Sequence, residues 1–158
     1  MDSYVKKKYT NFEEFYKDSI ELVEIIQSGT LQLDDKQKIN YARRILSKNV
    51  LNSFIKIGHI NEDIVKLLES RSNILLFSID NMIKNILSHP EVTAQDYSKI
   101  AIIIKNPSKY YKTKSGYDVI LFKKDNNCYK LVIKTTKNRR ENYVKSLHLL
   151  NKERYNKY

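Results

Sequence analysis

Four side chains that can act on a phosphate group occur at alternating positions in two segments with β-strand character. They are Lys130 and Lys134 in segment 128–135, and Ser146 and His148 in segment 143–150. Because alternate residues of a strand point to one face, pairing of the two segments would put all four on the same side of a sheet. An imidazole exchanges a proton near neutral pH, lysines stabilise charge on a phosphoryl oxygen, and a hydroxyl adds a hydrogen bond. The pattern predicts a phosphate-handling site. The alternative is a solvated polar face, which is common on antiparallel sheets.

The same alternation divides the rest of segment 143–150 between two faces. It puts Leu147 and Leu149 toward the core, and Val144 and Leu150 beside Ser146 and His148. A further imidazole, His89, directly precedes Pro90, where helical geometry is disfavoured. His89 is therefore a second candidate for proton transfer, with a structural or simply exposed loop residue as the alternative.

Other chemistries find little support. The chain has no GxxxxGK[ST] loop and no GxGxxG motif, and no His, Asp and Glu spacing is typical of a metal site. The acidic residues near the predicted strands are scattered, which argues against a metal-dependent nuclease. They are Asp96, Asp118, Asp125 and Glu141. The one cysteine, Cys128, excludes an intramolecular disulfide framework and is more typical of a half-buried strand residue than of a nucleophile. No cofactor is predicted.

The charge is concentrated in the second half of the chain. Of the formal net charge of +11, residues 1–90 contribute 13 basic and 12 acidic side chains, and residues 91–158 contribute 16 basic and 6 acidic ones. Such a basic half attracts polyanions, of which nucleic acid is the commonest. The candidate phosphate contacts outside the strands are Lys112, Lys114, Lys137, Arg139 and Arg140. For the loop 137–140, a solvated turn is the alternative.

The elements that must position these residues differ between the two halves. Apolar residues at helical spacing predict helices over 12–29, 34–58 and 61–87, which would form a small bundle. Thr93 is expected to cap a helix over 94–105, and alternation then predicts strands over 117–122, 128–135 and 143–150, with a last helical turn in 151–158. The predicted fold is α+β, with a helical domain at 1–87 and a basic domain of one helix and a small antiparallel sheet at 88–158.

The second half also resembles a known group of proteins. The run from His89 through Thr93-Ala94-Gln95-Asp96-Tyr97, the apolar segment 100–104 and Lys105-Asn106-Pro107 are similar to phage-type domains of the barnase–EndoU–colicin–RelE superfamily. The resemblance covers roughly residues 88–155. It implies a metal-independent ribonuclease fold in which His89, a sheet lysine (Lys130 or Lys134) and Ser146 occupy the site. Ser146-Leu147-His148 departs from the usual last strand, where a threonine precedes an aromatic residue.

The residues and the resemblance together predict a ribonuclease toxin that cleaves RNA, with transfer RNA among the candidates, by transesterification to a 2′,3′-cyclic phosphate. The alternative is a non-catalytic module that binds nucleic acid or inhibits a protein, as a phage regulator or an anti-defence protein would. A toxin would be expected to have an acidic immunity protein or antitoxin as partner. No apolar run reaches the roughly 18 residues of a membrane span. In residues 1–28, acidic side chains interrupt the apolar ones, so this segment lacks the apolar core of a signal peptide. We therefore expect a protein that acts in the cytoplasm.

Overall fold

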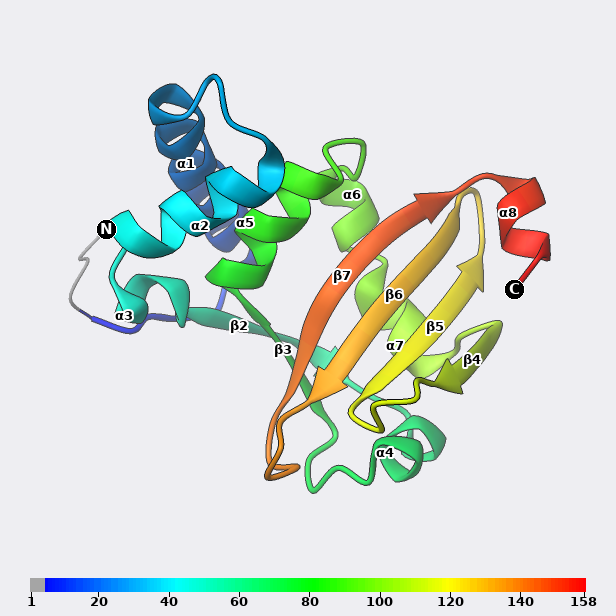
Figure 1. Cartoon of the computed structure of the whole chain (residues 1–158). Helices are drawn as coiled ribbons and strands as arrows, with labels where there is room; N and C mark the ends of the chain where they lie inside the picture. Colours follow the sequence, from blue (N-terminus) through cyan, green and yellow to red (C-terminus); the bar gives the residue numbers. More distant parts are fainter. Residues whose placement is uncertain (1–4) are drawn as a thin grey trace. The chain divides into compact units, whose positions relative to one another are not determined.

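The computed structural model describes residues 5–158 and contains helices and strands in both halves of the chain (Figure 1). The helices are α1 (Phe12–Gly29), α2 (Asp35–Ile45), α3 (Lys48–Leu51), α4 (Glu62–Leu68), α5 (Ile79–Ser88), α6 (Ala94–Tyr97), α7 (Ile100–Lys105) and α8 (Lys152–Asn156). The strands are β1 (Lys8–Tyr9), β2 (Phe54–His59), β3 (Ile74–Ser78), β4 (Lys109–Lys112), β5 (Asp118–Lys124), β6 (Cys128–Thr135) and β7 (Asn142–Leu150). No helix in residues 5–158 is long and apolar enough to cross a membrane.

The strands form a seven-stranded mixed sheet in the order β1-β2-β3-β7-β6-β5-β4. β1 pairs with β2 and β3 pairs with β7 in parallel, whereas β4, β5, β6 and β7 are antiparallel neighbours. The fold is therefore mixed α/β. The expectation of a small, purely antiparallel sheet is wrong, because three further strands come from the half of the chain predicted to be helical.

Two of these strands replace predicted helix. β2 (Phe54–His59) lies at the predicted end of the second helix, and β3 (Ile74–Ser78) lies inside the predicted third helix. The apolar run of β3 has no polar face, as is typical of a strand buried on both sides. The chain also turns before β3, since α4 ends at Glu69 with a φ of 52°. The predicted all-helical bundle in residues 1–87 is corrected accordingly.

By compactness the chain divides into two units. The first comprises the described residues up to Lys56 together with Phe77–Pro90, and the second comprises Ile57–Leu76 and Glu91–Tyr158. Residues 57–76, which the sequence analysis assigned to the first domain, thus belong with the second unit.

In the first unit, α1 and α2 pack on α5. The predicted N-cap of α1 is confirmed, because the Asn11 side chain accepts a hydrogen bond from the backbone N–H of Glu14. Buried aromatic rings join α1 to the segment that leads into α5, with Phe15 and Phe77 centroids 5.9 Å apart. Ile79 and Met82 of α5 complete this core, and both are fully buried.

In the second unit, β4 to β7 form an antiparallel sheet with α7 behind it in the view of Figure 1. The predicted hairpin turn at 125–127 between β5 and β6 is confirmed. The residues of the buried face are Val119, Leu121, Tyr129, Leu131, Ile133, Val144 and Leu147, and the helices contribute Tyr97, Ile100, Ile103 and Ile104. We call the opposite face of β4–β7, which is turned away from α7, the outer sheet face.

The start of β7 is fixed to β3 by a buried amide. Asn142 is fully buried, and its Nδ2 donates to the carbonyl oxygens of Ser72 (2.7 Å) and Ile74 (3.1 Å). Its Oδ1 accepts a hydrogen bond from Ser70 Oγ at 2.8 Å. Such a satisfied buried amide specifies one register, and it sets which β7 residues reach the outer sheet face.

A second polar anchor ties α6 to β6. The predicted cap at Thr93 is confirmed as a capping box with Asp96, although the helix predicted over 94–105 is divided into α6 and α7. Asp96 Oδ1 also accepts hydrogen bonds from the buried Tyr129 hydroxyl (2.7 Å) and from Asn127 Nδ2 (3.3 Å). Burial alone would raise the pKa of Asp96, but the hydrogen bonds from Thr93, Tyr129 and Asn127 to the carboxylate lower it.

Candidate nucleic-acid interface

The strand register brings four of the five predicted catalytic residues onto the outer sheet face. Lys130 of β6 is directly opposite His148 of β7, and Val132 is opposite Ser146. Lys134 lies two positions further along β6 on the same face, opposite Tyr143. All four side chains are partly exposed, whereas the alternate β6 residues Leu131 and Ile133 are fully buried.

A β-bulge changes the face assignment in the first part of β7. The register shifts between Val132 and Ile133, so that Val144 pairs with Ile133 and is fully buried. The prediction that Val144 shares a face with Ser146 and His148 is therefore wrong. The extra residue is Lys145, which is partly exposed like Ser146 next to it. The sequence signal for this bulge is the pair of polar residues Lys145-Ser146 between two apolar ones.

The bulge adds an ion pair to the outer sheet face. Lys145 Nζ on β7 lies 2.9 Å from Asp118 Oδ2 on β5. One strand, β6, lies between them, and its residue opposite Asp118 is Lys134. Asp118 compensates one positive charge here, and the sequence pattern predicts a role for neither partner. Ion pairs of this partly exposed kind contribute up to about 1 kcal/mol to stability.

The imidazole and the hydroxyl predicted to act together are in contact. His148 Nε2 and Ser146 Oγ are 3.0 Å apart, with donor and acceptor set by the tautomer of the ring. Their side chains are two positions apart on β7, beyond the bulge, so that both project on the outer sheet face. The hydroxyl can therefore orient the imidazole, as a hydrogen-bonding neighbour orients a general base.

Tyrosines flank the lysines at both ends of this face. Lys130 Nζ lies 5.0 Å above the Tyr158 ring and 3.4 Å from its hydroxyl. The hydrogen bonds from Lys130 and Arg154 lower the pKa of the Tyr158 hydroxyl. At the start of β7, burial and the neighbouring carboxylate of Glu141 raise the pKa of Tyr143 to about 12. Tyr143 is therefore a neutral hydrogen-bonding group at physiological pH.

The fifth predicted catalytic residue, His89, belongs to the first unit. It follows the last residue of α5, and its backbone N–H donates to the carbonyl oxygen of Asn85 at 2.8 Å. The second unit by itself brings together Lys130, Lys134, Ser146 and His148. The catalytic role of His89 stays a prediction.

The basic residues predicted to contact phosphate outside the strands divide into two groups. Arg139 Nη1 donates to the carbonyl oxygens of Leu68 (2.6 Å) and Gly116 (3.0 Å), and its guanidinium lies 4.4 Å above the Tyr117 ring. Glu69 is shared by Arg139 Nη2 and Lys112 Nζ, each at 3.7 Å. Both cations are thus engaged within the protein. The remaining three, Lys114, Lys137 and Arg140, are exposed.

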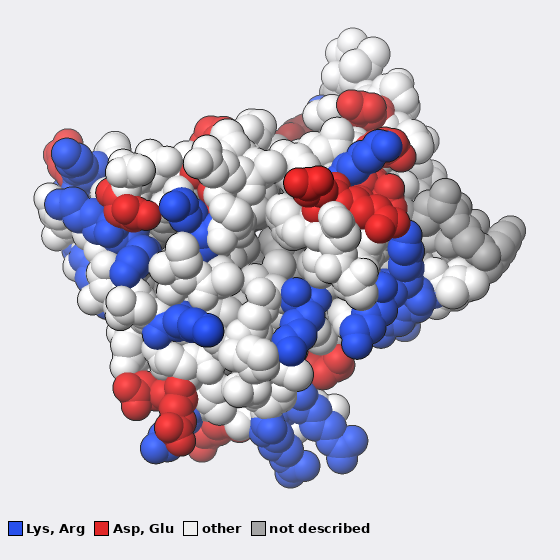
Figure 2. All heavy atoms as spheres, turned by 180° about the vertical axis from the view of Figure 1, so that it is seen from behind, with Lys and Arg blue, Asp and Glu red and all other residues white. Residues whose placement is uncertain are grey.

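The opposite side of the molecule does not form a single basic field. In the view from behind, Lys and Arg side chains are interspersed with groups of Asp and Glu (Figure 2). Charge alone therefore marks no binding surface on that side, and the outer sheet face is distinguished by the chemistry of its side chains. Within residues 5–158, no three His, Cys, Asp or Glu side chains come together as a metal-binding group.

Comparisons with models of protein families, with curated proteins and with solved structures give no match. The resemblance to the barnase–EndoU–colicin–RelE superfamily accordingly stays a prediction.

Proposed function

We propose that the outer sheet face binds the phosphate backbone of RNA and that His148 starts strand cleavage there. The observation that supports this proposal most directly is the contact of His148 Nε2 with Ser146 Oγ at 3.0 Å, with Lys130 opposite His148 on the neighbouring strand. A proton acceptor, a hydroxyl and ammonium groups on one open surface are suited to a phosphodiester.

In the proposed reaction, the substrate supplies its own nucleophile. The imidazole of His148 takes the proton of the ribose 2′-OH, and the 2′-oxygen forms a bond to the adjacent phosphorus. The bond from phosphorus to the 5′-oxygen breaks, and Lys130 gives its proton to that leaving oxygen. Lys134 stabilises the charge on the non-bridging oxygens, and Ser146 holds the imidazole. The products are a 2′,3′-cyclic phosphate and a 5′-hydroxyl end, without a metal-activated water.

Binding without cleavage is the second candidate function. One observation favours it: among the described residues, His148 is the only imidazole of the outer sheet face, since His59 ends β2 and His89 follows α5. Cleavage then requires a lysine as the general acid, and a lysine ordinarily gives up its proton far less readily than histidine near neutral pH. A regulator that covers RNA would need only the lysines.

The deciding experiment incubates the full chain with total RNA in EDTA and analyses the new ends. Cyclic phosphate ends are expected from the wild type, and His148→Ala should lower the rate by about 10²–10⁴-fold, as for loss of a general acid or base. The matched control is His59→Ala, which removes an exposed imidazole from the same unit. Equal loss in both variants, or cleavage only with Mg²⁺, would contradict the proposed reaction. Salt-sensitive binding without cleavage would favour the second candidate.

The proposed function also implies a partner protein and a place of action. A toxin of this kind would act on RNA in the cytoplasm, and an acidic immunity protein or antitoxin would cover the outer sheet face. Opposite charge on such a partner accelerates association. A binding screen against small acidic proteins encoded beside this chain tests that expectation, and the cleavage assay with the partner added should then show inhibition.

A further inference from the structure

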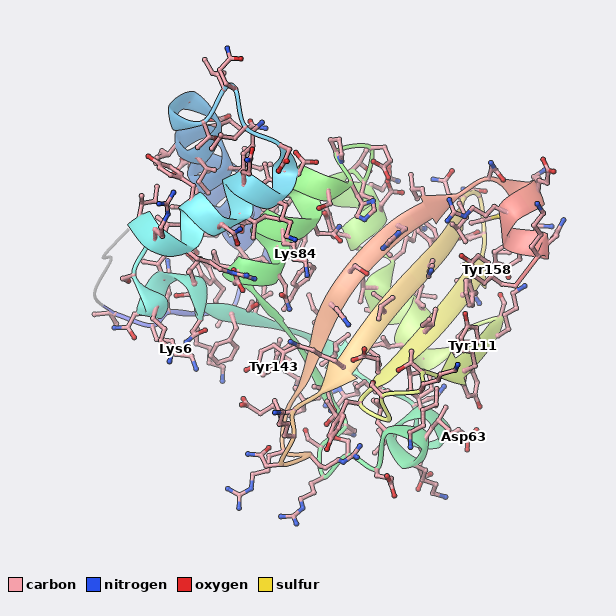
Figure 3. The ribbon with its side chains drawn as sticks, in the orientation of Figure 1. Lys6, Asp63, Lys84, Tyr111, Tyr143 and Tyr158 are labelled. Atoms are coloured by element: carbon pink, nitrogen blue, oxygen red, sulfur yellow. The ribbon has the colours of Figure 1, made fainter. Side chains whose placement is uncertain are left out.

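Aromatic rings line one end of the outer sheet face, beside the lysines of the proposed phosphate site. The ring centroids of Tyr111 in β4 and Phe122 in β5 are 5.9 Å apart, and that of Tyr158 is 4.6 Å from Phe122. Phe122 is fully buried beneath them, while Tyr111 and Tyr158 remain 44% and 39% exposed. Figure 3 shows both tyrosines at this end of the sheet, away from Tyr143.

The rings are held in place from below. Tyr155 of α8 and Cys128 of β6 pack around Phe122 as a small buried cluster. Lys109 Nζ donates to the carbonyl oxygens of Tyr155 (3.0 Å) and Tyr158 (2.7 Å), which fixes the C-terminal segment against the sheet. A supported ring loses little conformational freedom when a second ring stacks on it, so such a platform is preorganised for a flat ligand.

Positive charge adjoins the rings. Lys109 Nζ lies 5.6 Å from the Phe122 centroid, and Lys130 Nζ lies 5.0 Å from that of Tyr158. Lys130 is also the residue opposite His148. The aromatic row and the proposed phosphate site therefore share one ammonium group. A ligand that combines a flat ring with a phosphate would contact both.

We propose that Tyr111 and Tyr158 form a stacking subsite for an unpaired nucleobase of the RNA strand whose phosphate is held by Lys130. This inference rests on the proposed function and names its substrate class, a single-stranded RNA. In a duplex the base faces are covered by neighbouring base pairs, whereas unpaired bases stack readily on tyrosine rings. β4 and β7 are three strand spacings apart, about 14 Å, so the strand would cross the sheet from ring to imidazole.

The chain offers a matched control in the adjacent residue. Tyr110 is the same residue type on the same strand, is 39% exposed and is opposite Leu121, so its side chain projects to the other face. Substitution of Tyr110 should leave RNA affinity unchanged. Tyr111→Phe keeps the ring and should retain affinity, which separates loss of stacking from loss of fold.

The experiment measures binding of the full chain to two 2′-O-methyl strands of about ten nucleotides, within the length that single-strand sites cover. The 2′-O-methyl group removes the nucleophile and prevents cleavage. One strand carries bases, and the other is an abasic strand of equal charge. Tyr111→Ala is expected to weaken binding of the base-bearing strand by roughly 5- to 150-fold, the effect of losing one stacked base. It should leave binding of the abasic strand unchanged. Thermal denaturation of each variant confirms that it is folded under the binding conditions.

The outcomes separate this inference from the proposed function. If Tyr111→Ala weakens both strands equally, or affects the base-bearing strand no more than Tyr110→Ala does, the stacking subsite is refuted. Lys130→Ala should weaken both strands. If it does so while Tyr111→Ala has no effect, phosphate binding stands without the subsite. If neither strand binds the wild type, the proposed function fails. Equal affinity of the wild type for duplex and single strand would also overturn the subsite.

Discussion

The carboxylate of Asp96 should be one of the most sensitive polar positions in the second unit. It is 6% exposed and accepts hydrogen bonds from the Thr93 backbone N–H (2.9 Å), the Thr93 hydroxyl (3.0 Å), Tyr129 (2.7 Å) and Asn127 (3.3 Å). A hydrogen bond to a charged group contributes about 1.5–3 kcal/mol, and loss of a helix cap costs about 1 kcal/mol. Asp96→Ala should therefore lower the free energy of unfolding by about 2.5–4 kcal/mol.

A double-mutant cycle with Tyr129→Phe isolates the link between α6 and β6. The single change Tyr129→Phe should cost about 1–2 kcal/mol, because the buried carboxylate keeps its other donors. In the Asp96→Ala background the same change should cost much less, giving a coupling energy of about 1–2 kcal/mol. Urea denaturation followed by circular dichroism measures all four proteins. A coupling energy near zero would refute the assignment of this bond as an anchor of β6.

The pH dependence has a definite sign. The folded state lowers the pKa of Asp96 below its unfolded value of about 3.9. The carboxylate therefore stabilises the fold fully above about pH 4, and this stabilisation is lost as the pH falls through the folded pKa. Between pH 5 and 2, the wild type should lose more free energy of unfolding than Asp96→Ala. Parallel curves for the two proteins would contradict this reasoning.

Three other predictions concern the sheet and its loop. Leu147→Ala should lower the free energy of unfolding by about 2–5 kcal/mol because its side chain is fully buried, whereas His148→Ala should change it by less than about 1 kcal/mol; thermal denaturation compares them. Lys134→Ala should reduce the slope of log affinity for single-stranded RNA against log salt by about 0.7, as for one lost phosphate contact, and an unchanged slope would remove Lys134 from the interface. Arg139→Ala should cost about 2–3 kcal/mol through its hydrogen bonds to two carbonyl oxygens, whereas exposed Arg140→Ala should stay within about 0.5 kcal/mol; equal costs in urea denaturation would contradict the structural role of Arg139.

The parts of the fold that could be predicted are those set by neighbours in the sequence. The cap at Asn11, the cap at Thr93 and the hairpin of β5 and β6 depend on side chains a few residues apart, and each is confirmed. Period-two alternation likewise predicts that Lys130 and Lys134 share one face of β6, because the register shift at Val132/Ile133 puts the extra residue on β7 and leaves β6 regular. Local rules were sufficient wherever the partner was close along the chain.

The parts that failed depend on distant partners. A buried apolar run such as Ile74–Ser78 can be a strand or a helix, and only pairing with β7 decides between them. The bulge at Lys145 could have been inferred from its polar pair, yet strict alternation put Val144 on the wrong face. The aromatic row was also missed, because Tyr111 and Phe122 lie on different strands and Tyr158 follows α8.

The interleaving of the two units has a consequence for how the protein is made. Leu75 in β3 is paired with Asn142 in β7, so roughly seventy residues must still be synthesised before this partner exists. At about 5–20 residues per second the buried edge of β3 stays uncovered on the ribosome for several seconds. Such exposed strand edges promote misassembly. Slow, cool expression and chaperone supply should therefore raise the yield of the intact chain. If the gene were divided between residues 87 and 88, the second product would lack residues 57–76, which include α4 and most of β3 and belong to its unit. The first product would carry those residues without β7, with which β3 pairs.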